Sequence, residues 1–344
     1  MVQWATGAIG RHALRSVISR PGLELAGVLV YDPGKVGKDA GELAGLSPTG
    51  IVCTDDADRI MAMDADCVLH MPLPASYFGT NHAADLETIC ALLASGKNVI
   101  TTTGFVYPKA YGPSVVDSIE AACAKGGTTL HGTGVNPGFM SDFLPLALTG
   151  LSSRVDHIYV RESSDFRGHP SRQVVVDLVG FTRTAKDYAT TVRPYRAFQR
   201  MLFAESVQLV ADALDVRLDE VEETDEFALA AGEFEIAAGL VREGTVCASR
   251  WVFSGMARGR PFMTVEVVYK ADSARTERWA EPGFALHIEG VPHMSMAVGE
   301  VSHGLAAAAA HAVNAIPSVC AAPPGIRTLL DLPLPTGRGL VRLA

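Results

Sequence analysis

The chain has 344 residues and a mass of 36.4 kDa, of which 48% are hydrophobic and 19% charged. This composition excludes an intrinsically disordered chain, because disorder combines low hydrophobicity with high net charge. The net charge of −9 comes with no dense run of Lys or Arg, so nucleic acid is not an expected partner. At roughly 150 residues per domain, the length predicts two domains.

Six cysteines lie among apolar residues and form no CxxC pair. This usage is typical of buried thiols in a reducing compartment, and the ligand spacing of a zinc site is missing, so no metal is expected. No uninterrupted apolar run reaches the roughly 18 residues of a membrane span, and no signal peptide is evident before the first predicted strand. The sequence therefore predicts a cytoplasmic protein that does not bind membranes.

Residues 1–135 alternate between short apolar runs and helical patterns. Strands are predicted at 2–5, 23–31, 50–53, 66–71, 98–102 and 128–131, and helices at 11–19, 55–63, 81–95 and 113–125. Strands that alternate with helices of this length indicate βαβ units and a parallel sheet. The fold class is α/β, and residues 1–135 are predicted to form a Rossmann-type dinucleotide-binding domain.

The pattern changes after about residue 150. A strand is predicted at 155–162, mostly helix at 171–214, and long alternating stretches between 233 and 269, with the period of half-buried antiparallel strands. Residues 136–344 are therefore predicted to form an α+β domain with a mainly antiparallel sheet. A last helix, about 303–316, is expected to end before Pro317 and to pack back on the first domain.

A glycine-containing turn follows the first predicted strand. In W-A-T-G-A-I-G-R, Gly7 and Gly10 take the second and third glycine positions of the dinucleotide fingerprint, and Ala5 stands at the first. A pyrophosphate would bind there at the helix N-terminus, where free N–H groups and the helix dipole attract anions. The alternative is an ordinary strand-to-helix turn. The predicted phosphate-binding residues are Thr6, Gly7, Ala8, Ile9 and Gly10.

An acidic residue ends the second predicted strand. Asp32 lies 22 residues after Gly10, close to the spacing of about 20 for the carboxylate that binds the ribose hydroxyls. A carboxylate there repels a 2′-phosphate and favours NAD, whereas Lys35 or Lys38 could pair with that phosphate and admit NADP. A solvated turn is the alternative, and the choice between NAD and NADP stays open.

Further segments resemble a known family. Thr101–Phe105, T-T-T-G-F, resembles the G-T-T-G-F loop of dihydrodipicolinate reductases. Residues 132–139, G-T-G-V-N-P-G-F, are similar to a segment of a related branch, which holds 2,4-diaminopentanoate dehydrogenase and the native amine dehydrogenases. Residues 313–317 and 321–326 also resemble that branch. The likeness runs through most of the chain.

The resemblance implies a two-domain oxidoreductase that uses NADH or NADPH and forms a homodimer or a larger assembly. It implies that Met71 and Pro72 line the dinucleotide. It also places the turn of Thr102, Thr103 and Gly104 near the nicotinamide, with Asn136 and Pro137 around the nicotinamide carboxamide. These segments follow predicted parallel strands, and ligands bind at the carboxyl ends of such strands.

The sequence departs from the family pattern in two places. Residues 162–172 lack the His pair, the Lys and the Ser-Gly-Thr by which dihydrodipicolinate reductases hold a dicarboxylate. Residues 103–108 lack the glutamate that native amine dehydrogenases carry in this loop. The first departure argues against a lysine-pathway role, and the second leaves the residue that transfers the proton open.

The candidates for proton transfer are Glu162, Asp165, His169 and Tyr107. Three of them have a structural alternative: an ion pair of Glu162 with a nearby arginine, a surface turn at His169, and aromatic packing of Tyr107. An apolar substrate pocket is predicted from Phe105, Phe139 and Met140.

The leading interpretation is an NAD(P)-dependent amine dehydrogenase acting on a small amine, or on a ketone or aldehyde with ammonia. An imine or carbonyl reductase that works without ammonia is the first alternative, and a non-catalytic dinucleotide-binding regulator is the second.

Overall fold

The computed structural model describes residues 1–344 except 76–82, 170, 277, 300, 302 and 342–344. The chain divides into two compact units. Unit 1 comprises Met1–Ala75, Thr80–Phe139 and His303–Ala344, and unit 2 contains Met140–Ser302. The boundary therefore lies a few residues after the predicted 135, and the whole C-terminal segment, not only its helix, belongs to unit 1.

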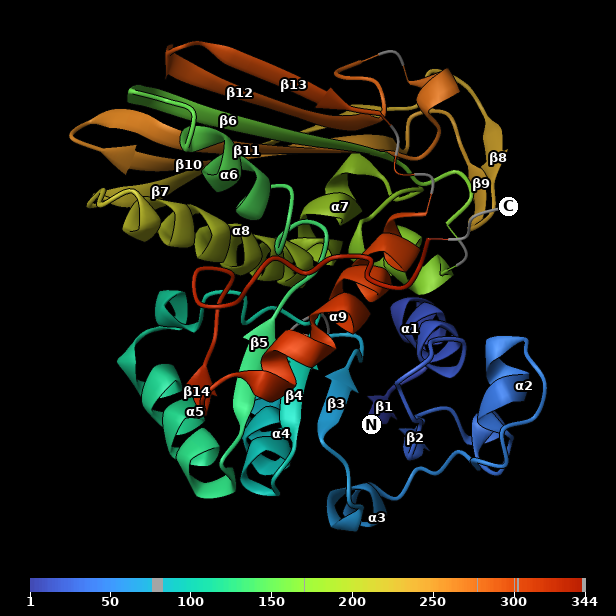
Figure 1. Cartoon of the computed structure of the whole chain (residues 1–344). Coiled ribbons are helices and arrows are strands. Elements are labelled where there is room, and N and C mark those ends of the chain that lie inside the picture. Colours follow the sequence, from blue (N-terminus) through green and yellow to red (C-terminus); the bar gives the residue numbers. More distant parts are fainter. Residues whose placement is uncertain (76–82, 170, 277, 300, 302, 342–344) are drawn as a thin grey trace. The chain divides into compact units, whose positions relative to one another are not determined.

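Unit 1 is built on a six-stranded parallel sheet with the order β14-β5-β4-β3-β1-β2 (Figure 1). Its strands are β1 (Val2–Trp4), β2 (Gly27–Leu29), β3 (Cys67–His70), β4 (Asn98–Thr101), β5 (Thr129–Gly132) and β14 (Gly325–Ile326). The predicted Rossmann-type parallel sheet is confirmed. The predicted strand at 50–53 is wrong, since Val52 forms only an isolated bridge to Asp39.

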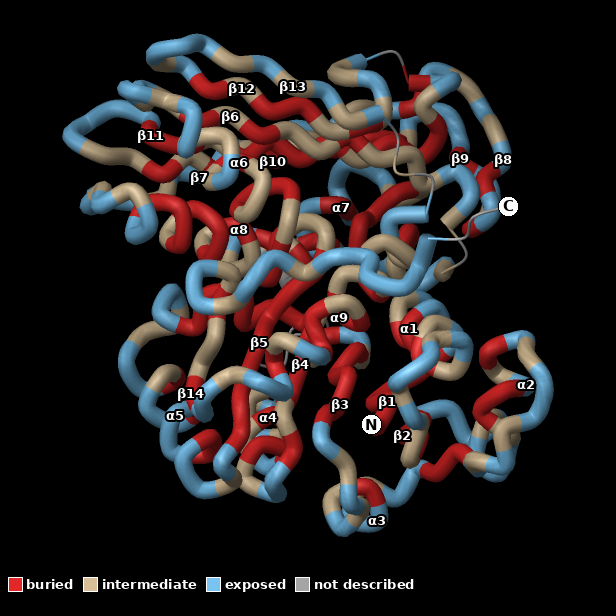
Figure 2. Tube along the Cα trace, viewed as in Figure 1, coloured by how far each residue is buried: buried red, intermediate tan, exposed pale blue. Residues whose placement is uncertain are grey.

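Helices cover both faces of this sheet (Figure 2). Side chains alternate along each strand, so Val68 joins the core under one set of helices while Cys67 and Leu69 join the core under the other. The first set is α3 (Ala57–Ala62), α4 (Ala83–Ala94) and α5 (Pro113–Gly126), and the second is α1 (Ala8–Ile18) and α9 (Gly304–Ala321). A short helix, α2 (Ala40–Ala44), packs against α1.

Helix α9 differs from its prediction in two respects. It continues through Pro317 to Ala321, because Ile316 and Val319 pack into the core while Pro317 lies on the exposed side. By length and composition alone, α9 could also cross a membrane, although its apolar residues do not form one uninterrupted run. Its apolar residues are those of a helix packed on a sheet.

Unit 2 contains a mixed six-stranded sheet with the order β13-β12-β6-β11-β10-β7, in which only β6 and β11 run parallel. The strands are β6 (Arg154–Asp165), β7 (Glu220–Leu229), β10 (Val246–Ala257), β11 (Arg260–Lys270), β12 (Gly283–Val291) and β13 (Met294–Val298). A separate pair joins β8 (Phe234–Ile236) to β9 (Gly239–Val241). The predicted mainly antiparallel sheet is confirmed.

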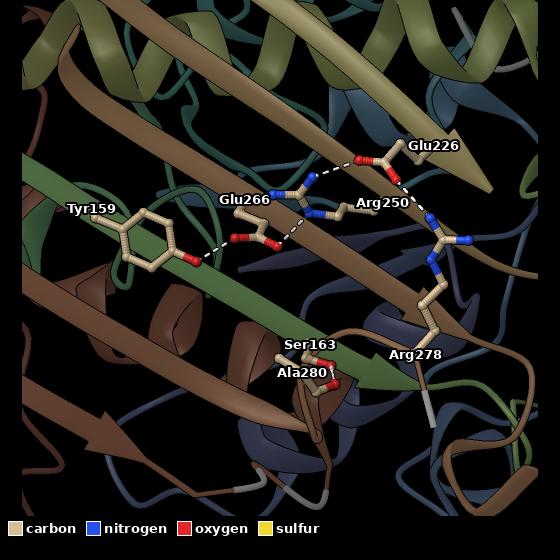
Figure 3. A network of polar contacts seen from close by, with 7 residues as sticks. All are labelled: Tyr159, Ser163, Glu226, Arg250, Glu266, Arg278 and Ala280. Atoms are coloured by element: carbon tan, nitrogen blue, oxygen red, sulfur yellow. Dashed lines mark hydrogen bonds and ion pairs between the residues drawn. The ribbon is translucent and has the colours of Figure 1, made fainter. Parts of the chain in front are cut away.

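Helices α6 (Phe143–Thr149), α7 (Ala185–Thr191) and α8 (Arg193–Ala213) lie along one face of this sheet (Figure 1). A π-helical turn, Gln173–Leu178, precedes α7. The opposite face carries a polar network across four strands, in which Tyr159 donates to Glu266 and Arg250 bridges Glu266 and Glu226 (Figure 3). Burial, together with the neighbouring Glu266 carboxylate, raises the pKa of Tyr159 to about 12.

Candidate functional site

The register of the parallel sheet aligns the ends of five strands. Leu29, Trp4, His70, Thr101 and Gly132 are neighbours in one row across β2, β1, β3, β4 and β5. Every predicted cofactor segment follows one of these strands directly. The sequence therefore leads all of these segments out of the same edge of the sheet, where open α/β sheets bind ligands.

The phosphate turn has two glycines with different surroundings. At Gly10, an added Cβ would lie 2.2 Å from the Ala5 carbonyl oxygen, so the close contact of α1 with this turn requires glycine. At Gly7, an added Cβ would meet nothing within 4 Å. Gly7 therefore presents bare backbone to open space at the start of α1, as the dinucleotide fingerprint requires for the pyrophosphate.

Ala5 adopts the conformation that the first glycine of the fingerprint usually takes. Its φ of 74° is left-handed, which costs an L-residue about 1–2 kcal/mol. Two hydrogen bonds hold it: its N–H donates to the Leu29 carbonyl at 3.0 Å, and its carbonyl accepts from Gln3 Nε2 at 2.9 Å. The turn thus has the fingerprint geometry without the first glycine.

Positive charge gathers at this turn. Gly7 is the N-cap of α1 and no side chain caps the helix, so the first N–H groups of α1 and the helix dipole are available to an anion. Lys35 Nζ donates to the Thr6 carbonyl at 3.0 Å, which brings an ammonium group to the same turn. The residues present therefore fit a diphosphate.

Asp32 lies in the loop after β2 and is exposed. Its Oδ1 accepts from the Gly34 N–H at 2.9 Å and caps the short 3₁₀ turn Pro33–Lys35. The carboxylate is thus held in place by its own loop while it stays open to solvent. This arrangement suits the binding of ribose hydroxyls.

We expect Asp32→Ala to weaken NAD binding about tenfold, because a charge-assisted hydrogen bond contributes about 1.5–3 kcal/mol. NADP binding should weaken less, because the substitution also removes the repulsion between Asp32 and the 2′-phosphate, which NAD lacks. Calorimetric titration with both coenzymes measures the ratio. Asp56→Ala is the matched control, since Asp56 is also an exposed N-capping aspartate, at α3. An unchanged ratio of the two affinities in Asp32→Ala would contradict the assignment.

Two further segments follow β3 and β4. Met71 is buried and its N–H donates to the Trp4 carbonyl at 3.0 Å, while Pro72 is half-buried. The Thr102 N–H donates to the His70 carbonyl at 3.2 Å, and Gly104 has a φ of 100°. Left-handed backbone at this position favours glycine. The loop therefore turns sharply at the edge of the sheet.

The segment after β5 depends on close backbone contacts. An added Cβ at Gly132 would lie 2.2 Å from the Phe105 carbonyl oxygen, and one at Gly138 would lie 2.2 Å from the Gly134 nitrogen. Between them, Asn136 and Pro137 are joined by a cis peptide bond. Thr133 Oγ1 lies 2.8 Å from Nδ1 of His311, so α9 holds the start of this segment.

The predicted substrate-pocket residues have different surroundings. Phe105 is 1% exposed and packs in the core of unit 1, where its ring stacks on Tyr111 with centroids 4.9 Å apart. Phe139 is half-buried and meets the ring of His311 edge-on. Met140, in unit 2, lines a small apolar pocket with Leu144, Val160, Phe284, Ala285, Leu286, Met296 and Val298. Phe105 thus packs in the core of unit 1, and the substrate pocket of Phe105, Phe139 and Met140 stays a prediction.

The candidates for proton transfer lie in both units. Tyr107, in unit 1, is buried and precedes a short 3₁₀ turn, Pro108–Tyr111, which indicates packing. Glu162 is half-buried on β6 in unit 2 and accepts from Ser164 Oγ at 3.0 Å. His169 stacks on Phe166, and burial lowers its pKa. Asp165 accepts from Ser273 and from the Arg167 N–H, which is a structural role.

The sequence analysis did not predict roles for the buried polar side chains within the strands of unit 1, among them Gln3, which holds Ala5, and His70. The available signal was a polar residue within a strand that is otherwise apolar. Among the described residues, no group of three His, Cys, Asp or Glu side chains is placed to hold a metal ion.

Comparison with known proteins identifies the family of this chain. Residues 139–340 match the 2,4-diaminopentanoate dehydrogenase C-terminal domain. The chain belongs to the 2,4-diaminopentanoate dehydrogenase family. Residues 1–111 match the N-terminal domain of dihydrodipicolinate reductase. The resemblance seen in the sequence motifs is thereby confirmed.

Two curated relatives match nearly the whole chain. An amine dehydrogenase of Streptomyces virginiae is 31% identical over 97% of this chain and 96% of its own length. The 2,4-diaminopentanoate dehydrogenase of Acetoanaerobium sticklandii is 24% identical over 96% of this chain and 92% of its own length. An amine dehydrogenase structure from Mycobacterium smegmatis shares the fold, with a TM-score of 0.82 at 20% identity over 98% of this chain and 96% of that one.

Proposed function

We propose that this member of the 2,4-diaminopentanoate dehydrogenase family is an NAD(P)-dependent amine dehydrogenase. It would interconvert a small amine with the corresponding ketone or aldehyde and ammonia. The observation that carries the proposal is the phosphate turn: bare backbone at Gly7 faces open space beside an uncapped helix N-terminus and the ammonium of Lys35. The full-length likeness to an amine dehydrogenase supports the substrate class.

Different residues of unit 1 would bind different parts of the coenzyme. The first N–H groups of α1 and Lys35 would bind the diphosphate, and Asp32 the adenosine ribose. Met71 and Pro72 would line the dinucleotide, while the turns at Thr102–Gly104 and Asn136–Pro137 would hold the nicotinamide. The coenzyme supplies the hydride, and the protein supplies orientation and electrostatics. For proton transfer we propose Glu162, since Tyr107 is packed in the core.

One observation favours a second function. Residues 103–108 contain no carboxylate, although native amine dehydrogenases carry a glutamate in the loop that these residues resemble. A reductase of an imine or of another C=N or C=O group works without ammonia, so it would not need the glutamate that amine dehydrogenases carry there.

A spectrophotometric assay separates the functions. We expect the purified protein to oxidise NADH or NADPH in the presence of cyclohexanone or a short aldehyde only when ammonium is added. The near-ultraviolet absorbance of the reduced coenzyme reports the rate. Oxidation that proceeds equally well without ammonium would support the reductase instead. Coenzyme binding without turnover across a broad panel of carbonyl substrates would support the non-catalytic regulator.

We also propose a homodimer, as the resemblance implies. The polar face of the unit 2 sheet, with Arg250, Glu226 and Glu266, lies opposite the face along which the described helices of unit 2 lie (Figure 1). This polar face supports an association of this kind. Light scattering should give twice the chain mass of 36.4 kDa. A mass of one chain would contradict the proposal.

A further inference from the structure

A buried histidine stands at the end of an otherwise apolar strand. The other residues of β3 are Cys67, Val68 and Leu69, and all are fully buried. His70 is 1% exposed and lies beside Thr101 in the sheet register. Burying an imidazole in such surroundings is unfavourable unless it gains a hydrogen bond. The partner of His70 therefore indicates what the residue does.

The contacts of His70 form a chain of three side chains. His70 Nδ1 lies 3.1 Å from Thr101 Oγ1, and Thr101 Oγ1 lies 2.8 Å from Thr103 Oγ1. The Thr103 N–H also donates to Thr101 Oγ1, at 3.2 Å. Both threonines are at most 1% exposed. The chain leads from the interior of the sheet to the turn that follows β4.

His70 is neutral in this series of hydrogen bonds, since burial lowers its pKa to about 3. A neutral imidazole either donates or accepts at Nδ1, according to its tautomer. In both cases the direction of the hydrogen bond at Nδ1 decides which partner the Thr101 hydroxyl donates to, and hence the orientation of the Thr103 hydroxyl.

The turn at which this series of hydrogen bonds ends has a strained backbone. Gly104 has a φ of 100° and Phe105 a φ of 61°, and a left-handed conformation is unfavourable for a residue with a side chain such as phenylalanine. Such a conformation persists only when the surrounding contacts determine it. The bonds from Thr101 to Thr103 supply contacts directly before these two residues.

We propose that His70 is a positioning residue, which acts through Thr101 to fix the turn Thr102–Gly104 against the nicotinamide of the bound coenzyme. The proposal rests on the proposed function, because that function brings the nicotinamide to this turn. His70 touches neither coenzyme nor substrate in this scheme. Its effect is on the geometry of hydride transfer, in which a displacement of about 1 Å can lower the rate on the order of a hundredfold.

The test uses variants that remove or keep the hydroxyl of Thr101. We expect Thr101→Val and His70→Phe to lower kcat at least tenfold, while the Kd for the coenzyme changes less than threefold, since the diphosphate and ribose contacts remain. Thr101→Ser keeps the hydroxyl and should restore kcat to within threefold of the wild type. Thr129→Val is the matched control: Thr129 is equally buried on β5, but its hydroxyl donates to the Pro323 carbonyl.

The outcomes separate this inference from the proposed function. If the wild type is catalytically active and Thr101→Val is equally active, the positioning role is overturned and the proposed function stands. If His70→Phe does not fold, the Thr101→Val and Thr101→Ser pair decides. If the wild type binds NADH without turnover, the emission of bound NADH replaces kcat: a shift in Thr101→Val that Thr101→Ser reverses supports the role, and no shift overturns it. A wild type that binds neither coenzyme overturns both proposals.

Discussion

Gly7→Val is expected to abolish most of the affinity for pyridine coenzymes without loss of stability. A side chain at Gly7 meets no protein atom within 4 Å, and the φ of −69° is open to any L-residue, so the folded chain accepts valine. The side chain would instead fill the space through which the diphosphate approaches the backbone. We expect the Kd to rise at least tenfold, by about 1.4 kcal/mol, as measured by calorimetric titration.

Gly10→Ala is the counterpart in the same turn and should lower the stability of the fold, which Gly7→Val should not. Its Cβ would lie 2.2 Å from the Ala5 carbonyl oxygen and 3.1 Å from Gln3 Nε2, so α1 must move away from the turn. Such overpacking costs roughly 3 kcal/mol, which thermal unfolding will show as a lower midpoint. Equal coenzyme affinity in wild type and Gly7→Val would show that the diphosphate does not lie at this turn.

Unit 1 is expected to lose stability as the pH falls below 6.5. Burial lowers the pKa of His70 to about 3 and that of His131 to about 4, whereas an unfolded histidine titrates near 6.5. Because both values are depressed in the folded state, their contribution is fully present above pH 6.5 and is lost as the pH falls toward the folded values. Together the two histidines account for about 3 kcal/mol between pH 6.5 and 5.

Chemical denaturation at a series of pH values measures this loss. His131→Gln should roughly halve the slope below pH 6.5, because one of the two buried imidazoles is gone. His293→Gln, at an exposed position in unit 2, is the control and should leave the slope unchanged. A free energy of unfolding that stays constant from pH 6.5 to 5 would contradict the prediction.

The parallel sheet of unit 1 could be predicted because its strands are apolar runs bounded by turn residues and separated by helices. The run at 50–53 had the same local pattern, but it forms only one isolated bridge, between Val52 and Asp39, and Val52 is 52% exposed. Strand β14 is two residues long and carries no periodic signal. Its pairing with β5 depends on contacts nearly 200 residues apart in sequence, which no local pattern reveals.

Unit 2 was harder to predict for a related reason. Strand β7 reads E-V-E-E-T-D-E-F-A-L, a composition of low strand propensity, and it forms the edge of the sheet. Edge strands tolerate charge, which also discourages pairing with other chains. The pattern of β10 and β11, by contrast, alternates clearly and was predicted.

For the candidate site, the local sequence was sufficient to predict residues whose role depends on backbone conformation. It was insufficient for residues whose role depends on whether the side chain is buried. Gly7 and Gly10 could be placed from the fingerprint. Phe105 was predicted to line the substrate pocket, and Tyr107 was a candidate for proton transfer with aromatic packing as the alternative. Both side chains are buried in unit 1, which no local pattern showed. Gln3 and His70, whose side chains hydrogen-bond the neighbouring turns, lie within strands. A single polar residue in a strand matches no known motif, so their roles could not be predicted.

Unit 1 contains both ends of the chain: α9 covers one face of its sheet and β14 pairs with β5 at one edge. Unit 2, in contrast, is formed by one continuous stretch of the described chain from Met140 onward. During synthesis, the nascent first half therefore leaves the ribosome with Leu69, Ile100 and their neighbours uncovered. It must wait for the last helix to be translated, so chaperone dependence should fall on the unit that is made first.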